Sequence, residues 1–350
     1  MRRQISILSL LAVVVFFTVQ SSCKKNDATP GDGTTTPTPL AFNQPAGWPS
    51  PQYDFTQNPL TQEGFKLGRK LFYDPRLSSD GTISCENCHQ QFASFVMFDH
   101  DLGHGVNGTH TMRNPQPLIN LAWHKEMMWD GGVNHIEVQP LVPFTAPNEM
   151  NETLNGIMTK IQGDATYRKM FKDAFGDENI TSQRMLKAIT QFMLMIVSAD
   201  SKYDRVKKGL ENFTPLEDIG YQFFKAKCNT CHTEPLFTDL SYRNNGRPLN
   251  TVLQDYGRMR ITNNPADSLK FKVPSLRNAA LTYPYTHDGT IYGLDQMVDH
   301  YRFNVVNHPS TDPLVRGGIS MTATEKAGVV AFIKTLTDTT VTKNVLFSGQ

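Results

Sequence analysis

Two copies of the pattern Cys-x-x-Cys-His constrain this chain more than any other feature of its sequence. They read CENCH at residues 85–89 and CNTCH at residues 228–232. In such a run two cysteines attach a c-type haem through thioether bonds and the histidine ligates the iron, so the fold has to enclose a haem. The alternatives are a redox-active dithiol, or a zinc site that pools both runs and leaves the two histidines surplus. We expect two covalently bound haem c groups, held by Cys85, Cys88, His89, Cys228, Cys231 and His232.

The first 22 residues are predicted to be a secretory signal peptide. Arg2 and Arg3 precede an apolar run at residues 5–19 that is too short to span a membrane. Cys23 follows two serines, as at the cleavage site of a bacterial lipoprotein, and its lipidation would anchor the mature protein to a membrane. Gln20 departs from the aliphatic residue usual in such sites, so cleavage to a soluble periplasmic protein is the alternative. Either process exports the protein to the periplasm or cell envelope.

Composition divides the remaining chain into a tether and two domains. Residues 23–47 are polar and rich in Thr, Pro and Gly, which predicts a flexible lipoprotein-type tether. From Trp48 the composition is that of a globular protein, and we expect an N-terminal domain at 48–205 and a C-terminal domain at 206–350, each with one haem run. The formal net charge of +1 gives no indication of nucleic acid binding.

Helix signals dominate the globular part. Helical spacing of apolar residues predicts helices within 60–75, 178–198, 213–228 and 320–336. The third of these starts with the capping pair Thr214 and Glu217, and the fourth with the pair Thr322 and Glu325. Strand patterns are scarce, and many Gly, Pro and Asn residues predict long loops. We therefore expect a mostly α fold of two class I cytochrome c-like domains.

The chain resembles the bacterial dihaem cytochrome c peroxidase and MauG family. The matching runs, in order between residues 64 and 336, are LGRKLFYDPRLS, ISCENCH, GHG, RNPQPLIN, MWDGG, NEM, CNTCH, DYGRMRIT, VPSLRNAALTYPYTHDG and GVVAFIKTL. The resemblance implies an oxidoreductase that reduces hydrogen peroxide to water, with electrons passed from the C-terminal to the N-terminal haem. It also implies a small electron donor, either a cytochrome c or a copper protein, and allows for a homodimer.

The resemblance assigns roles around the N-terminal haem, whose proximal ligand is His89. A displaceable sixth ligand falls on His104, between Gly103 and Gly105; the alternative is a loop histidine that touches only solvent. Glu149 falls at the position of a distal glutamate that moves a proton, unless it simply starts the helix that runs through Leu154. Two further positions line the same site: Gln139 and Pro143.

The resemblance also assigns residues between the haems. Trp129 matches a tryptophan that relays electrons, although it could equally be a core residue. Gly132 departs from an arginine that usually follows Trp-Asp-Gly, so any contact of that arginine is missing or supplied elsewhere. A calcium ion would be bound by Asn114, Thr282 and Pro284.

The sixth ligand of the second haem separates the peroxidases from MauG-like members. The matching position is Tyr301, where donor-fed peroxidases have a methionine; Met297, His300 and Met321 are neighbouring candidates, and core packing is the alternative for Tyr301. A tyrosine favours a MauG-like oxidase that uses peroxide to oxidise a partner protein or an organic substrate. A non-catalytic dihaem electron carrier is a third hypothesis.

Overall fold

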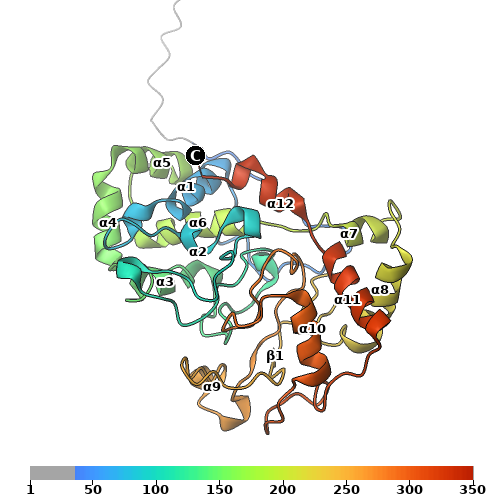
Figure 1. Cartoon of the computed structure of the whole chain (residues 1–350). Helices are drawn as coiled ribbons and strands as arrows, with labels where there is room; N and C mark the ends of the chain where they lie inside the picture. Colours follow the sequence, from blue (N-terminus) through green and yellow to red (C-terminus); the bar gives the residue numbers. More distant parts are fainter. Residues whose placement is uncertain (1–35, 350) are drawn as a thin grey trace, which may run out of the picture. The chain divides into compact units, whose positions relative to one another are not determined.

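Helices and long loops make up residues 36–349, the part of the chain that the computed structural model describes (Figure 1). The α-helices are α1 (Gln62–Phe72), α2 (Cys85–Cys88), α3 (Leu141–Thr145), α4 (Leu154–Gly163), α5 (Ala165–Phe175), α6 (Ser182–Leu194), α7 (Lys202–Lys207), α8 (Pro215–Lys227), α9 (Met259–Thr262), α10 (Leu294–Phe303), α11 (Ala323–Thr335) and α12 (Thr339–Lys343). Short 3₁₀ turns are η1 (Pro75–Leu77), η2 (Gln91–Ala93), η3 (Val106–Gly108), η4 (Leu121–Trp123), η5 (Ile136–Val138), η6 (Pro265–Asp267) and η7 (Val345–Phe347). Two short strands, β1 (Tyr242–Arg243) and β2 (Phe271–Lys272), pair antiparallel with Tyr242 opposite Lys272. The mostly α prediction is confirmed.

The four helices predicted from the sequence are present as α1, α6, α8 and α11. The side chain of Thr214 caps α8 by accepting from the amide of Glu217, and Thr322 caps α11 through Glu325 in the same way. In each capping box the glutamate accepts the amide of the threonine in return, which satisfies two donors that the helix start would leave unpaired. Both helix starts therefore lie where the local sequence predicts them.

Two helix pairs cross at positions where a side chain would not fit. Helices α1 and α6 lie side by side, and a Cβ at Gly68 would come within 1.9 Å of the Ala188 carbonyl (Figure 1). Helices α8 and α11 meet likewise, where a Cβ at Gly220 would come within 1.9 Å of the Gly328 carbonyl. Because α1 and α8 each precede one haem run, the two halves repeat one local arrangement. This repetition supports the two cytochrome c-like domains, which remain a proposal.

The apolar core of the N-terminal half is rich in aromatic side chains, and three of the largest, Phe72, Phe95 and Phe192, pack within about 6.3 Å of each other. Two smaller clusters in the C-terminal half surround α8 and α11, one around Phe332 and one around Ile333. Burying such side chains supplies most of the stabilisation of the fold, about 25 cal/mol per Å² of apolar surface. The cores hold the helices that carry the haem runs.

The start of the folded part needs a correction. Residues 36–47 fall within the predicted tether of 23–47, yet the Leu40 amide bonds to the Leu60 carbonyl at 2.9 Å and the Gln62 amide to the Thr38 carbonyl at 2.9 Å. Leu40 and Phe42 also pack against the N-terminal core. These two apolar side chains give a polar stretch enough buried surface to be ordered. The predicted signal peptide, 1–22, and Cys23 lie outside the described residues.

The end of the described chain returns to the N-terminal half. Val341 and Phe347 belong to the N-terminal core, and the hydroxyl of Tyr73 donates to the Phe347 carbonyl at 2.6 Å. Residues 36–349 thus lie in one compact unit, in which the predicted boundary at residue 205 remains a proposal. None of the helices described there has the length and apolar character needed to cross a bilayer.

Candidate haem sites

The first haem run forms the short helix α2 and the residue that ends it. The Ser84 amide donates to Asn87 Oδ1 at 2.7 Å, and the His89 amide donates to the Cys85 carbonyl at 2.9 Å. His89 Nδ1 lies 2.9 Å from the carbonyl oxygen of Phe95. A carbonyl can only accept, so Nδ1 carries the proton and Nε2 offers its lone pair to a metal. Burial lowers the pKa of His89 to about 4, which keeps the imidazole neutral.

The second run repeats this arrangement directly after α8. The His232 amide donates to the Cys228 carbonyl at 2.9 Å. His232 Nδ1 lies 3.2 Å from the Phe237 carbonyl and 3.1 Å from the Pro274 carbonyl, so Nε2 is again the free nitrogen. Burial lowers the pKa of His232 as well. Both runs therefore present a neutral histidine in the tautomer that an iron ligand requires.

The thiols distinguish between haem and zinc. Cys85, Cys88, Cys228 and Cys231 are free, and burial raises the pKa of Cys85 to about 12. Without a bound metal, this raised pKa favours the protonated thiol over the thiolate that zinc binds. Within residues 36–349 no group of three or more His, Cys, Asp or Glu side chains is placed to hold a metal ion, so the described structure gives no support to the pooled zinc site. The arrangement suits a pair of thiols that form thioether bonds.

A largely apolar cavity lies at the second run, and we call it the CNTCH cavity. It is lined by the run itself and by helices α8, α10 and α11, with these residues among its walls: Phe224, Cys228, Cys231, His232, Leu276, Met297, Val298, Tyr301, Met321, Val329 and Ile333. Arg247 also lines it, and the Nε of Arg247 is buried without a hydrogen-bond partner in the described chain. An anionic group such as a haem propionate would satisfy this donor. Apolar walls, paired thiols, a neutral histidine and an unpaired guanidinium nitrogen fit haem c.

All three candidate sulfur and phenol ligands line this cavity, namely Tyr301, Met297 and Met321. Tyr301 and Met297 lie one turn apart on α10. The pKa of Tyr301 is raised to about 12, first by burial and also by the nearby thiols Cys228 and Cys231. His300 points elsewhere, because its Nε2 lies 2.9 Å from the Asn245 carbonyl. Tyr301 thus lies near both cysteines of the run, and Met297 and Met321 remain candidates in the same cavity.

The residues expected between the haems also meet at the CNTCH cavity. Trp129 Nε1 donates to the Asn114 carbonyl at 2.8 Å, and both residues line the cavity together with Thr282 and Pro284. The Asn114 amide nitrogen Nδ2 donates to the Asp101 carbonyl at 3.0 Å, which fixes its side chain. Any calcium bound here would depend on amide and carbonyl oxygens, since no carboxylate cluster is placed to hold it among residues 36–349.

Glu149 lies beside the first run and outside any helix. Helix α4 begins only at Leu154, with Thr153 as its cap, so the alternative in which Glu149 starts this helix is wrong. Burial raises the pKa of Glu149, and the Glu149 charge in turn raises the pKa of Cys88. A carboxyl group next to a haem cysteine, with its proton affinity raised, is suited to proton transfer.

The Gly-His-Gly loop packs against both Cys88 and the Glu149 segment. The His104 carbonyl lies 3.9 Å from Cys88 Sγ, and a Cβ at Gly103 would come within 2.8 Å of that sulfur. A Cβ at Gly105 would come within 2.2 Å of the Asn148 carbonyl. The two glycines thus let the loop approach Cys88 and Asn148 closely, in addition to the backbone freedom that the sequence predicts.

The ring of His104 packs between the rings of His100 and His110, at centroid distances of 5.0 and 4.7 Å. The backbones of His104 and His110 also form an isolated antiparallel bridge, which brings these two histidines opposite each other. These contacts, within residues 36–349, join His104 to other loop histidines and not to His89. If His104 ligates a metal at His89, its release would require a change of this loop.

Gln139 carries an unused acceptor. Its Nε2 donates to Met128 Sδ at 3.2 Å, while its Oε1 is buried without a hydrogen-bond partner in the described chain. A buried amide oxygen of this kind costs about 1–3 kcal/mol unless a ligand or water donates to it. Pro143, the other predicted lining residue, bonds through its carbonyl to the Met150 amide at 3.0 Å and so fixes the Glu149 segment.

Two arginines were missed by sequence reasoning. Arg258 donates to the Asp130 carbonyl at 2.8 Å and stacks on Tyr242 at 4.1 Å, so it supplies a guanidinium beside Gly132, where the family arginine is absent. Arg113 bonds to Asp255 at 2.6 Å and to Asp130 at 2.7 Å, which fixes the segment that carries Trp129. Both arginines stand in runs that matched the family, but their partners are too distant in sequence for local rules to predict.

Comparison with known proteins agrees with this geometry. A family model described as di-haem cytochrome c peroxidase matches residues 62–212. The methylamine utilization protein MauG of Methylorubrum extorquens is 32% identical over 302 residues, covering 84% of this chain and 83% of the relative. The cytochrome c551 peroxidase of Nitrosomonas europaea is 34% identical over 277 residues, covering 78% of this chain and 79% of the relative.

A solved structure gives the same result. The crystal structure of a MauG-like protein associated with microbial copper homeostasis superimposes with a TM-score of 0.77 at 31% identity, covering 88% of this chain and 99% of the other. Relatives named as cytochrome c peroxidases indicate a peroxidase-type oxidoreductase, and the family implies haem c as cofactor. The chain belongs to the di-haem cytochrome c peroxidase family.

Proposed function

We propose that the chain reduces hydrogen peroxide to two water molecules at a haem held by Cys85, Cys88 and His89, with two electrons and two protons. The observation that carries the proposal is the placement of Glu149 beside Cys88. The Glu149 side chain is partly buried, and this burial raises the pKa of its carboxyl group. A protein that only carries electrons has no use for such a group at this position, and burying it costs stability. The placement of Glu149 therefore weighs against the non-catalytic electron carrier.

Haem c, when bound at both runs, supplies an iron site for O–O bond cleavage and stores the electrons that the reaction consumes. The protein contributes proton transfer. Glu149 accepts a proton from the near oxygen of peroxide and returns it to the far oxygen, which leaves as water. Gln139 can accept a hydrogen bond from the bound peroxide through its unpaired Oε1. Movement of the loop that carries His104 would open or block the place where peroxide binds at the first site.

Cys228, Cys231 and His232 would hold the second haem, which would supply electrons to the first site. Support comes from Trp129, whose indole lines the CNTCH cavity and bonds to Asn114 on the segment that follows the His104 loop. An indole can lose and regain an electron, so Trp129 is a relay in this proposal. A small cytochrome c or copper protein supplies the electrons. We also propose calcium at Asn114, Thr282 and Pro284, export to the periplasm, and anchoring through Cys23.

A second candidate function is a MauG-like oxidase, in which the two electrons come from an oxidisable residue of a partner protein or from an organic substrate. One specific observation favours it: Tyr301, and not only a methionine, lies close to both cysteines of the second run. A tyrosine ligand stabilises ferric iron and lowers the potential, which disfavours acceptance of electrons from a high-potential donor. The identity to the MauG protein of Methylorubrum extorquens is compatible with either function.

One assay tests the first function against the second. The full chain with both haems is mixed with hydrogen peroxide and a reduced small cytochrome c, and oxidation of the donor is followed. We expect two donor molecules to be oxidised per peroxide. Absence of donor oxidation, together with peroxide consumption that depends on an organic reductant, would support the oxidase; absence of any peroxide consumption would overturn both functions.

The identity of the second ligand is settled by reductive titration of three variants, Tyr301→Phe, Met297→Leu and Met321→Leu. If Tyr301→Phe alone changes the spectrum of the second haem and both haems titrate at low potential, the oxidase gains support. If a methionine variant alone lowers a high potential, the protein is a donor-fed peroxidase.

A further inference from the structure

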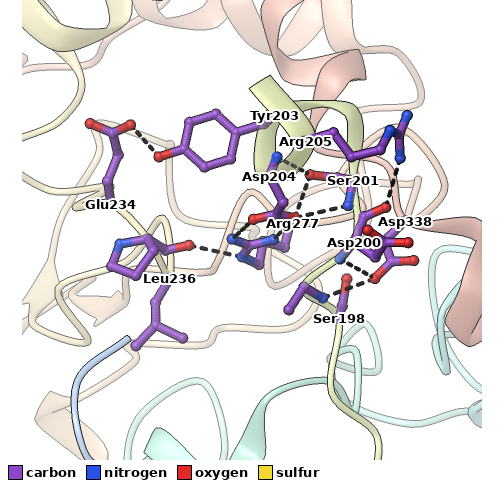
Figure 2. Close-up of polar contacts among 12 residues, drawn as sticks. Ser198, Asp200, Ser201, Tyr203, Asp204, Arg205, Glu234, Leu236, Arg277 and Asp338 are labelled. Atoms are coloured by element: carbon purple, nitrogen blue, oxygen red, sulfur yellow. Dashed lines mark hydrogen bonds and ion pairs between the residues drawn. The ribbon is translucent and has the colours of Figure 1, made fainter. Parts of the chain in front are cut away.

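The run VPSLRN, at residues 273–278, matched the family but received no role in the proposed function. Figure 2 shows Arg277 of this run among polar contacts that include those with Asp204. Arg277, which is fully buried, pairs through Nη2 with Asp204 at 2.8 Å and donates through Nε to the Pro235 carbonyl at 2.8 Å. Breaking a buried pair of this kind commonly costs 3–5 kcal/mol. The run is therefore held firmly against the loop that follows the second haem run.

Each candidate iron ligand is oriented by the carbonyl of a phenylalanine in an unusual backbone conformation. His89 Nδ1 bonds to the Phe95 carbonyl, where φ is 60°, and His232 Nδ1 bonds to the Phe237 carbonyl, where φ is 56°. Ser94 also has a left-handed φ of 63°. Such conformations cost about 1 kcal/mol or more for L-residues and persist only where neighbouring contacts hold them.

The VPSLRN run supplies those contacts at the second site. The hydroxyl of Ser275 donates to the Leu236 carbonyl at 2.6 Å, and the Leu276 amide donates to the Phe237 carbonyl at 3.2 Å. Pro274 offers its own carbonyl to His232 Nδ1 at 3.1 Å. The run therefore supplies one carbonyl acceptor of His232, that of Pro274, and bonds to the other, that of Phe237.

The same run reaches the first site through Asn278. Its Nδ2 donates to Ser94 Oγ at 2.8 Å and lies 3.3 Å from Ser198 Oγ, while its Oδ1 accepts from the Asp338 amide at 2.6 Å. All four residues are buried, with at most 1% of their surface exposed. The bond to Ser94 holds the left-handed residue directly before Phe95, whose carbonyl orients His89.

We propose that Ser275 and Asn278 are positioning residues that fix the hydrogen-bond acceptors of both iron-ligating histidines, and thereby set the reduction potentials of the two haem sites from one run of chain. The proposal rests on the proposed roles of His89 and His232. When Nδ1 of the histidine donates a hydrogen bond, Nε2 becomes a more basic ligand for the metal. The geometry of this hydrogen bond therefore affects the reduction potential of the haem iron. Neither residue touches the reacting atoms.

The test compares three serine variants of the full two-haem protein. Ser94→Ala removes the acceptor for Asn278 near His89, Ser275→Ala removes the bond to Leu236 near His232, and Ser198→Ala is the matched control. Ser94 and Ser198 are equally buried and bond to the same nitrogen of Asn278, so loss of either should lower the urea midpoint similarly.

We expect Ser94→Ala to shift the midpoint potential of the first haem alone, Ser275→Ala to shift that of the second alone, and Ser198→Ala to shift neither. A shift in Ser198→Ala as large as that in Ser94→Ala, or unchanged potentials in both test variants, would overturn the proposal. Haem content measured on the same samples distinguishes failure of the positioning role from failure of the proposed iron ligands. Two haems per chain with unmoved potentials overturn only the positioning role, whereas fewer than two haems in the parent protein overturn the proposed ligands as well.

Discussion

The amide nitrogen of Val106 donates a 2.8 Å hydrogen bond to the carbonyl oxygen of Glu149. This bond joins the residue that follows Gly105 to the proposed proton-transfer residue. Movement of the His104 loop therefore pulls on the segment that carries the carboxyl group. We expect the position of Glu149 to change when the His104 loop moves, because the hydrogen bond between Val106 and Glu149 connects the two segments.

The raised pKa of Glu149 predicts how stability depends on pH. A protonated, partly buried carboxyl stabilises the folded state fully below the pKa of the unfolded chain, about 4.3, and this contribution is lost as pH rises through the folded pKa. Glu149→Gln cannot ionise, so the unfolding free energy of the parent relative to this variant should fall as pH rises. Urea titrations at pH 4 and pH 8 measure the difference.

Glu152 gives the opposite sign and serves as control. Its hydrogen bond to Lys160 lowers the pKa of Glu152, so the stabilisation is present at neutral pH and is lost as pH falls. Equal pH dependence of the Glu149→Gln and Glu152→Gln comparisons would contradict the burial of Glu149.

Replacing Trp129 should slow electron delivery. Trp129→Phe loses the bond to the Asn114 carbonyl, at a cost of about 1 kcal/mol in stability, and removes the indole from the CNTCH cavity. We expect kcat to fall by about tenfold, equivalent to about 1.4 kcal/mol in the barrier, with haem content unchanged. Trp123→Phe is the control, since Trp123 bonds to the Pro49 carbonyl in the core. It should lose more stability and keep its kcat; a larger loss of kcat in Trp123→Phe would argue against the relay.

The helix crossing at Gly220 should not tolerate a methyl group. Gly220→Ala places a carbon within 1.9 Å of the Gly328 carbonyl, so α8 and α11 must separate, at a cost of about 1–3 kcal/mol. Gly163 in α4 has open space where a Cβ would lie. Gly163→Ala should therefore leave stability unchanged or raise it by up to about 1 kcal/mol. Thermal unfolding of both variants measures the difference between their midpoints. Equal midpoints would mean that α8 and α11 do not pack closely at Gly220.

Local patterns explain which parts of the structure could be predicted. The start of α11 follows from Thr322 and Glu325 because a capping box depends on residues three apart. The two haem runs are equally local. The pairing of Arg277 with Asp204 joins residues 73 apart, and no rule of spacing connects them. Long-range contacts of this kind are selected by the folded surroundings and leave no periodic signal.

In the candidate site, too, the sequence could predict residue identities but not the long-range contacts that place them. Residue types and the family resemblance were sufficient to nominate Glu149, but its position beside Cys88 depends on how the His104 loop and α3 pack. Arg258 brings a guanidinium to the carbonyls of Asp130 and Gly131 from more than a hundred residues away, which a match of short runs cannot reveal. The ordering of residues 36–47 was missed because two apolar side chains, Leu40 and Phe42, decide it within a polar stretch.

The most direct test of the proposed function is the rate of peroxide reduction by Glu149→Gln and Glu152→Gln, each with two haems per chain. The substitutions are identical and lie three residues apart, but only Glu149 lies beside Cys88, while Glu152 pairs with Lys160. We predict that Glu149→Gln loses about 10²–10⁴-fold in kcat, as expected for a general acid–base residue, and that Glu152→Gln keeps its activity. Full activity in Glu149→Gln, or an equal loss in both variants, would contradict the proposed proton transfer.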